Sequence, residues 1–147
     1  MNSHRSLNIL LIEDSQADVL LFQEALSDSN IQWEHVTDGE KAIQYFQQQE
    51  HNPGQSLPNL IVLDLNLPRV HGHEVLEYLK SHPKLAHIPV FVWTTSNNRT
   101  DVEQSYNSHA NGHLIKPPDL AGFFSMVQKL ESFWTHIATL PMPSFHP

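Results

Sequence analysis

Short apolar runs alternate along this chain with longer segments in which apolar residues recur at helical spacing. Five runs predict strands, at residues 9–12, 33–36, 60–63, 90–93 and 113–115. The first, third and fourth runs are apolar without alternation, which is typical of central strands buried on both faces. Because each run is followed by a helical segment, the pattern predicts an α/β fold in which five strand–helix pairs build one parallel sheet.

Two of the predicted helices carry specific packing expectations. In the first helix, one face collects apolar residues that we expect to lie on the sheet: Ala17, Leu20, Leu21 and Ala25. In the helix over residues 99–108, Val102 and Tyr106 are the clear apolar anchors. We therefore expect this fourth helix to be the least firmly packed of the set.

The last predicted helix, from about Asp119, is apolar around half of its circumference. Its apolar residues from Leu120 to Ile137 cover an arc of about 180°, wider than the ~100° stripe that docks on one core. One explanation is that the tail, residues 138–147, folds back over the surplus. A homodimer through this helix and a different protein partner are the alternatives.

This helix also sets the expected division of the chain. We expect an N-terminal tail (1–6), one domain (7–130) and a C-terminal extension (131–147) that is a candidate dimerisation segment. In a homodimer, three aromatic residues are the expected interface: Phe123, Phe133 and Trp134.

The composition narrows the classes of partner and compartment. The 147 residues include 16 acidic and 8 basic side chains, a formal net charge of −8 with neutral histidines. This argues against nucleic acid, because duplex binding depends on Lys and Arg at the phosphates. The chain has no cysteine, which excludes a disulfide framework and a catalytic thiol. Its apolar runs are far shorter than the roughly 18 residues of a membrane span, so we expect a cytoplasmic protein without membrane contact.

Polar residues that could bind ligands or take part in catalysis follow four of the predicted strands. The first strand ends in Glu13 and Asp14, the third in Asp64, the fourth in Thr94 and the fifth in Lys116. The carboxyl ends of parallel strands share one edge of a sheet, where ligands bind at the point of strand-order reversal. Aspartates after strands also serve as plain helix caps, but five such residues together favour a site.

Three carboxylates at one edge repel each other unless they take up protons or bind a cation. Oxygen ligands in small number suit Mg²⁺ better than zinc or a fully caged Ca²⁺. A nucleotide or flavin site is disfavoured, because Glu13-Asp14-Ser15 would repel a bare phosphate and the chain has neither G-x-G-x-x-G nor a Walker loop. A phosphatase with an aspartyl nucleophile typically has a second Asp two residues on, where this chain has Asn66.

The strand-end motifs together resemble the receiver domains of two-component response regulators. They are Glu13-Asp14, Asp64-Leu65-Asn66-Leu67-Pro68, Gly72, Thr94-Thr95-Ser96 and Lys116-Pro117. The resemblance implies a flavodoxin-like, doubly wound (βα)5 fold with sheet order 2-1-3-4-5. The stretches 131–134 and 139–141 further resemble the C-terminal extension of regulators that partner cyanobacterial phytochrome histidine kinases.

The resemblance assigns chemistry to these positions. It makes Asp64 the acceptor of a phosphoryl group from a kinase phosphohistidine. It implies that Mg²⁺ is held by Asp14, Asp64 and the backbone carbonyl of Asn66, with Glu13 acting through water.

Four further roles follow from the same resemblance. Lys116 would contact a phosphoryl oxygen, and Thr94 would donate a hydrogen bond to another. Asn66 and Ser96 would flank the attacking water and set the lifetime of the phosphorylated state. The family often has a cis bond at the position of Lys116-Pro117.

The sequence departs from the family at the switch. Thr94 and His113 occupy the two switch positions, but receivers usually carry Tyr or Phe where this chain has His113. This histidine is either a pH-sensitive switch or an exposed residue of an edge strand. By resemblance alone, the first helix would dock the kinase through Gln16, Asp18 and Gln23. Two alternatives from other classes are a dimerising scaffold that never carries phosphate and a metal-dependent hydrolase.

Overall fold

The computed structural model describes residues 7–26, 30–52 and 57–142. Its strands are β1 (Leu7–Ile12), β2 (Ile31–Val36), β3 (Leu60–Leu63), β4 (Val90–Thr94) and β5 (Gly112–Ile115). Its helices are α1 (Gln16–Ala25), α2 (Gly39–His51), α3 (Gly72–Ser81), α4 (Arg99–Asn107), α5 (Leu120–Ser132) and the π-helical turn η1 (Phe133–Ile137). Strand and helix alternate, as the hydrophobic pattern predicts.

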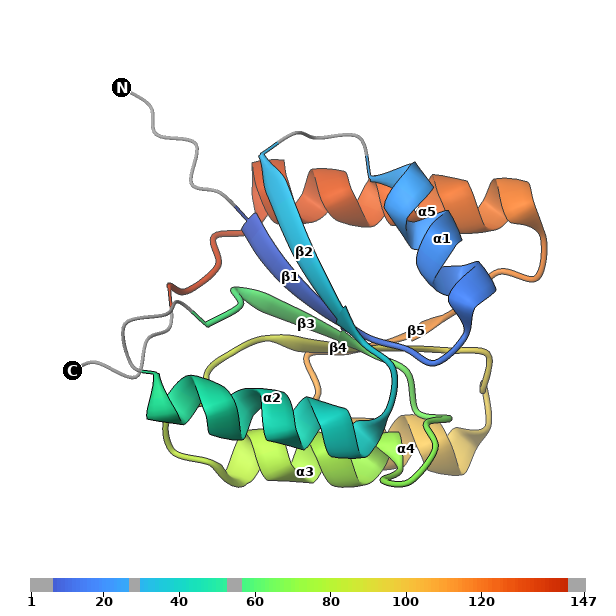
Figure 1. Ribbon diagram of the computed structural model, residues 1–147. Helices are drawn as coiled ribbons and strands as arrows, with labels where there is room; N and C mark the ends of the chain where they lie inside the picture. Colours follow the sequence, from blue (N-terminus) through green and yellow to red (C-terminus); the bar gives the residue numbers. More distant parts are fainter. Residues whose placement is uncertain (1–6, 27–29, 53–56, 143–147) are drawn as a thin grey trace.

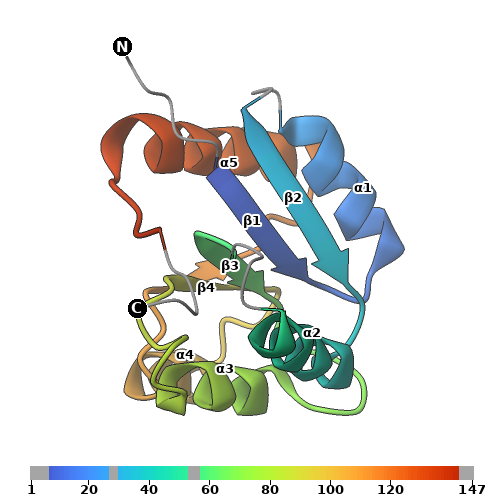
Figure 2. The same cartoon turned by 60° about the vertical axis from the view of Figure 1, so that its left-hand side comes forward.

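The five strands form one parallel sheet in the order β2-β1-β3-β4-β5. Helices α1 and α5 cover one face, and α2, α3 and α4 cover the other (Figures 1 and 2). The predicted flavodoxin-like, doubly wound fold is therefore confirmed. The strand order reverses at β1, so the loops after β1 and β3 lie side by side at the point where such sheets bind ligands.

The central strands are buried on both faces, which explains their unbroken apolar sequence. On the side of α2 and α3, a core forms around Leu10, Ile61 and Val92. On the side of α1 and α5, a second core forms around Ile9 and Val62. Full burial stabilises each such side chain by roughly 1.5–3 kcal/mol, so the two cores together fix the register of the sheet.

The packing face of α1 differs from the sequence expectation. Val19, Phe22 and Ala25 are buried against the sheet, whereas Ala17 is exposed and Leu20 is 58% exposed. The reason is Phe22, whose ring packs edge-on against Trp33 of β2 at a centroid distance of 6.3 Å. Burying this larger side chain rotates the helix away from the expected phase.

Helix α4 also buries a different residue from the one expected. Tyr106 is 52% exposed and Val102 is half-buried, while Ser105 is fully buried. The expectation that apolar anchors hold α4 is therefore wrong for Tyr106. Polar contacts of Ser105 take part in fixing this helix, as described below.

The last helix extends from Leu120 to Ile137, and it changes from an α-helix to the π-helical turn η1 after Ser132. Phe123 and Trp134 are buried within the chain, at 4% and 3% exposed. Trp134 packs on Phe91 with ring centroids 5.5 Å apart. The expectation that Phe123 and Trp134 face a second subunit is therefore wrong, since the chain's own sheet covers them.

Part of the tail folds back on the same core. Leu140 is half-buried against the cluster of α1 and α5, and the Asn59 side-chain amide donates to the carbonyl of Pro141 at 3.0 Å. The folding-back alternative is thus supported for residues 138–142. The remaining tail, 143–147, and the N-terminal segment, 1–6, lie outside the described residues.

Two further features concern the chain as described. Within the described ranges, none of the helices has the length and apolar character needed to cross a membrane. The Lys116–Pro117 bond is trans.

Candidate functional site

The carboxylates predicted at the strand ends converge. Glu13, Asp14 and Asp64 each offer an oxygen within 4.8 Å of the others, although Asp64 comes 51 positions after Glu13 in the sequence. Glu13 and Asp64 are buried, and Asp14 is exposed. The loops after β1 and β3 carry them because these strands are neighbours in the sheet.

Backbone hydrogen bonds continue past the strand ends and hold the site residues in place. The amide of Glu13 donates to Val36 of β2 at 3.0 Å, and the amide of Asp64 donates to Ile12 at 3.0 Å. The amide of Lys116 likewise donates to the carbonyl of Thr94 at 2.8 Å. The sheet itself therefore sets the positions of the acidic groups and the lysine.

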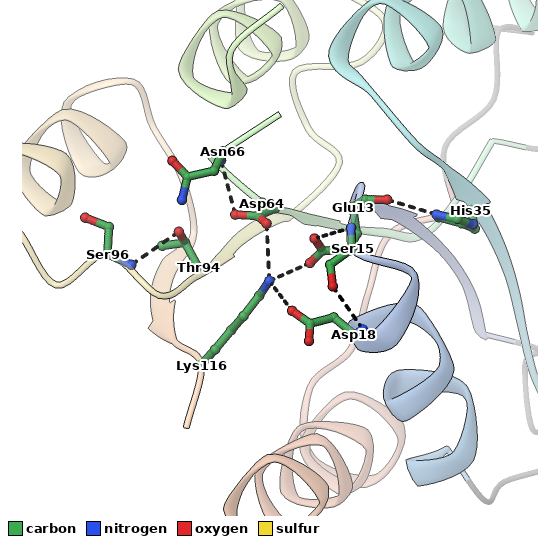
Figure 3. A network of polar contacts seen from close by, with 9 residues as sticks. All are labelled: Glu13, Ser15, Asp18, His35, Asp64, Asn66, Thr94, Ser96 and Lys116. Carbon is green, nitrogen blue, oxygen red and sulfur yellow. Dashed lines mark hydrogen bonds and ion pairs between the residues drawn. The ribbon is translucent and has the colours of Figure 1, made fainter. Parts of the chain in front are cut away.

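Lys116 lies at the centre of the acidic cluster (Figure 3). Its Nζ lies 2.6 Å from Glu13 Oε1, 2.7 Å from Asp18 Oδ2 and 3.2 Å from Asp64 Oδ2. Burial alone lowers the pKa of Lys116, but the adjacent Glu13 and Asp18 outweigh it and raise the pKa above its usual value. The ammonium therefore stays charged, which is what buried carboxylates require of a partner.

Asp18 is a site residue that the sequence expectation missed. It was expected to face solvent for kinase docking, but its carboxylate turns inward to Lys116. Ser15 caps α1 by accepting from the Asp18 amide at 3.3 Å, which places Asp18 in the first turn. The expectation missed it because the hydrophobic pattern gave a different rotation of α1 from the one that Phe22 sets.

The raised pKa of Glu13 indicates that one lysine does not neutralise the negative charge of the cluster. Burial, followed by the hydrogen bond and charge of Asp64, raises the pKa of Glu13 to about 8, although Lys116 acts in the opposite direction. At pH 7 a proton on the Glu13 carboxyl group therefore competes with a metal cation for the same oxygens. All three ligand groups are carboxylates, so the residues present fit a hard divalent cation such as Mg²⁺.

The hydroxyl and amide residues border Asp64 on the other side of the site (Figure 3). Thr94 is fully buried at the end of β4, and its Oγ1 accepts from the Ser96 amide at 3.3 Å. The backbone N–H of Asn66 donates to Asp64 Oδ1 at 3.2 Å, and the Asn66 side chain is exposed. Asn66 therefore contacts the Asp64 carboxylate directly, and Thr94 and Ser96 lie on the same side of the site as Asn66 (Figure 3). Their roles stay predictions.

His113 is not the exposed edge-strand residue of one expectation. It is half-buried in β5, and both ring nitrogens have partners. Its Nδ1 lies 2.9 Å from the Ser105 hydroxyl, and its Nε2 lies 3.0 Å from the Ser96 carbonyl. Its role in a switch stays a prediction.

Comparison with known proteins identifies the family. A family model for the response regulator receiver domain matches residues 9–128. The chain belongs to this family. Response regulator Rcp1 of Synechocystis sp. is 49% identical over 135 residues, which cover 90% of this chain and 92% of Rcp1. This chain is therefore a response regulator, of the class that acts in two-component signalling.

Comparison with solved structures shows which response regulators this chain resembles. The Mn(2+)-bound form of Rcp1 is 46% identical, with a TM-score of 0.85, and the match covers 92% of this chain and 99% of Rcp1. The phosphorylated cyanobacterial phytochrome response regulator RcpA is 42% identical, with a TM-score of 0.86 and coverage of 95% and 99%. The resemblance to regulators of cyanobacterial phytochromes is therefore confirmed.

Proposed function

We propose that this response regulator accepts a phosphoryl group from a histidine kinase on Asp64. The observation that carries the proposal is the buried Asp64 carboxylate, which lies 3.2 Å from the Lys116 ammonium among two other carboxylates. The ammonium neutralises charge on an incoming phosphoryl group, so that an anion can approach this acidic cluster.

In the proposed reaction, an Asp64 oxygen attacks phosphorus while the bond from phosphorus to the kinase imidazole nitrogen breaks. The products are an acyl phosphate on Asp64 and the free kinase histidine. A bound Mg²⁺ would neutralise charge on both nucleophile and phosphoryl group. Asp14, Asp64, the Asn66 carbonyl and Glu13 are the groups that would hold it.

The rest of the site then binds the phosphoryl oxygens. Lys116 exchanges part of its contact with Asp64 for a phosphoryl oxygen and keeps its bonds to Glu13 and Asp18. The hydroxyl of Thr94, which now accepts from the Ser96 amide, keeps its proton free to donate to the phosphoryl group. Phosphorylation then changes the surface around the β4–α4 loop, and a protein partner recognises this change.

A phytochrome-type histidine kinase is the proposed partner, and the support is the similarity to RcpA, which is described as a cyanobacterial phytochrome response regulator. The exposed face of α1 is the proposed docking surface. Gln16 and Gln23 are exposed there, and Leu20 adds an apolar contact at 58% exposed. Asp18 is no longer part of this surface because it pairs with Lys116.

Intact mass spectrometry tests the proposed function. Incubation of the full chain with Mg²⁺ and acetyl phosphate should add the mass of one phosphate. A chain that gains no phosphate and binds no Mg²⁺ would instead be a scaffold. Turnover of small phosphate esters would point to a metal-dependent hydrolase.

We expect Mg²⁺ to stabilise the protein, and more strongly at high pH. Without metal, the raised pKa of Glu13 gives a stability contribution that is complete near pH 4.5 and is lost as pH rises through about 8. A cation that displaces this proton binds more tightly once the proton has gone. The gain in unfolding free energy from Mg²⁺ should therefore grow by about 1 kcal/mol from pH 7 to pH 9.

Thermal or urea unfolding with Mg²⁺ and with EDTA measures this gain at each pH. Taking the difference between the two cancels the titration of histidines remote from the site. The variant Glu13→Gln, which cannot bind the contested proton, should show a gain that no longer changes with pH. A pH-independent gain in the wild-type chain would contradict the competition between proton and metal.

We propose a homodimer through the C-terminal extension, with a smaller interface than the sequence suggested. Phe133 and Ile137 of η1 are 41% and 72% exposed, so they remain candidates for an interface after Phe123 and Trp134 have been taken up by the core. We expect Phe133→Ser to lower the mass measured by sedimentation to that of a monomer. The exposed Leu120→Ser is the matched control, and an unchanged mass for Phe133→Ser would exclude this interface.

We further propose a cytoplasmic location and no association with membranes or nucleic acid. The support is the acidic charge of −8 and the absence of a membrane-spanning helix from the described residues.

A further inference from the structure

A buried hydroxyl connects three elements beside the site. Ser105 of α4 is fully buried, and its Oγ lies 2.9 Å from His113 Nδ1 of β5. The same Oγ lies 3.0 Å from the carbonyl oxygen of Asp101 and 3.4 Å from Nε2 of His73 in α3. Buried polar groups with several partners specify one arrangement, so Ser105 fixes how α3, α4 and β5 meet.

His113 passes this constraint on to the loop after β4. Its Nε2 lies 3.0 Å from the carbonyl oxygen of Ser96, and a carbonyl only accepts hydrogen bonds, so Nε2 carries the proton. In the neutral ring, Nδ1 is an acceptor, and it shares the single Ser105 hydroxyl proton with the carbonyl oxygen of Asp101. With both nitrogens bonded, the ring has one orientation, which a Tyr or Phe ring at this position would not share.

Ser96 is consequently held at three points. Its amide donates to Thr94 Oγ1 at 3.3 Å, its hydroxyl donates to Asp101 Oδ2 at 2.6 Å, and its carbonyl accepts from His113. Figure 3 shows Ser96 beside Thr94, at the edge of the site away from Glu13. A loop held in this way opens to solvent less often than one held only by its own backbone.

We propose that His113 and Ser105 are positioning residues that hold Ser96 beside Thr94 and thereby slow hydrolysis of the acyl phosphate on Asp64. The inference rests on the proposed function. In hydrolysis, a water oxygen bonds to phosphorus, the bond from phosphorus to the Asp64 oxygen breaks, and inorganic phosphate and the Asp64 carboxylate form as a proton leaves to solvent. The step needs water at phosphorus, and a fixed Ser96 loop restricts its access.

The decay of phosphorylated full-length chain tests the proposal. The chain is phosphorylated with acetyl phosphate and Mg²⁺, the donor is removed, and the half-life is followed by intact mass. Ser105→Ala and His113→Phe should each shorten the half-life about fivefold, the factor that corresponds to one lost hydrogen bond. His113→Gln keeps an amide donor within reach of the Ser96 carbonyl and should stay within about twofold of wild type.

Matched controls separate positioning from general loosening. Glu103→Gln removes a charge from the exposed face of the same helix, where Glu103 pairs with Arg99 at 2.9 Å, and should leave the half-life unchanged. Half-lives equal to wild type in both Ser105→Ala and His113→Phe would overturn the proposal. Equal half-lives for His113→Phe and His113→Gln would also overturn it, because the hydrogen bond would then have no effect.

Hydrogen exchange gives a readout that does not need the phosphorylated chain. In unphosphorylated Ser105→Ala, amides of the loop from Thr95 to Asn98 should exchange about fivefold faster than in wild type, while the amides of β1 keep their wild-type rates. Unchanged exchange in this loop would overturn the proposal that Ser105 and His113 hold Ser96 in place. A wild-type chain that takes up no phosphate would overturn the proposed function, and the exchange result would still show whether Ser96 is held.

Discussion

Asp64→Asn should abolish the gain of one phosphate when the chain is incubated with Mg²⁺ and acetyl phosphate. An amide nitrogen or oxygen at this position is not a nucleophile for phosphorus at neutral pH, whereas the ionised carboxylate is. We expect adduct formation to fall by at least about 100-fold, below detection by intact mass. The amide is similar in size to the carboxyl group, so the buried site should still pack.

A second aspartate serves as the control for this variant. Asp119 caps α5 by accepting from the Gly122 amide at 2.9 Å and lies on the surface. Asp119→Asn should take up phosphate as the wild-type chain does. If Asp64→Asn gained phosphate at the wild-type rate, the acceptor would be another residue and the proposed role of Asp64 would be wrong.

Gly72→Ala should lower the unfolding free energy by about 3 kcal/mol and displace Asp64. A Cβ on Gly72 would lie 2.5 Å from both the carbonyl oxygen of Asp64 and the Cα of Leu65. Both are backbone atoms, so neither gives way without moving the loop after β3. The Gly72 amide also donates to the carbonyl of Leu65 at 3.0 Å, which ties the start of α3 to this loop.

Urea unfolding measures the loss of stability, and the rate of phosphate uptake measures the displacement of Asp64. Gly122→Ala is the matched control, because the atoms nearest its added Cβ belong to the side chains of Asp119 and Pro117, at 2.9 and 3.0 Å. It should change the unfolding free energy by less than about 1 kcal/mol. Equal losses for the two variants would contradict the role of Gly72 in placing Asp64.

The sequence was informative where the backbone alone determines position. Glu13, Asp64, Thr94 and Lys116 each stand at the end of an apolar run, and parallel strands bring their carboxyl ends to one edge. The pairing of neighbouring strands then brings these residues together, independently of their side-chain contacts. This is why the sequence alone predicts the acidic cluster and its lysine.

Side-chain partners were harder to anticipate. Asp18 turns inward to Lys116 because Phe22, which packs on Trp33, sets the rotation of α1. The contact between Ser105 and His113 depends on how α4 lies on β5, and hydrophobic periodicity does not report on a helix held in part by hydrogen bonds.

The C-terminal helix shows the same division. Part of its apolar arc, including Phe123 and Trp134, is covered by the chain's own core, while Leu120, Phe133 and Ile137 stay exposed. Periodicity cannot say which of these residues the same chain covers. The π-turn after Ser132 rotates Trp134 onto Phe91, and the bond from Asn59 to Pro141 draws the tail back over the core.

By itself, the sequence determined the order of strands and helices, the parallel sheet and the edge at which the carboxylates meet, because these depend on local periodicity and on the chain direction of parallel strands. The tertiary structure decided the partners of Lys116, the three-point hold on Ser96 and the burial of Phe123 and Trp134. Those features depend on helix rotation and on contacts between residues far apart in the chain, which local sequence does not encode.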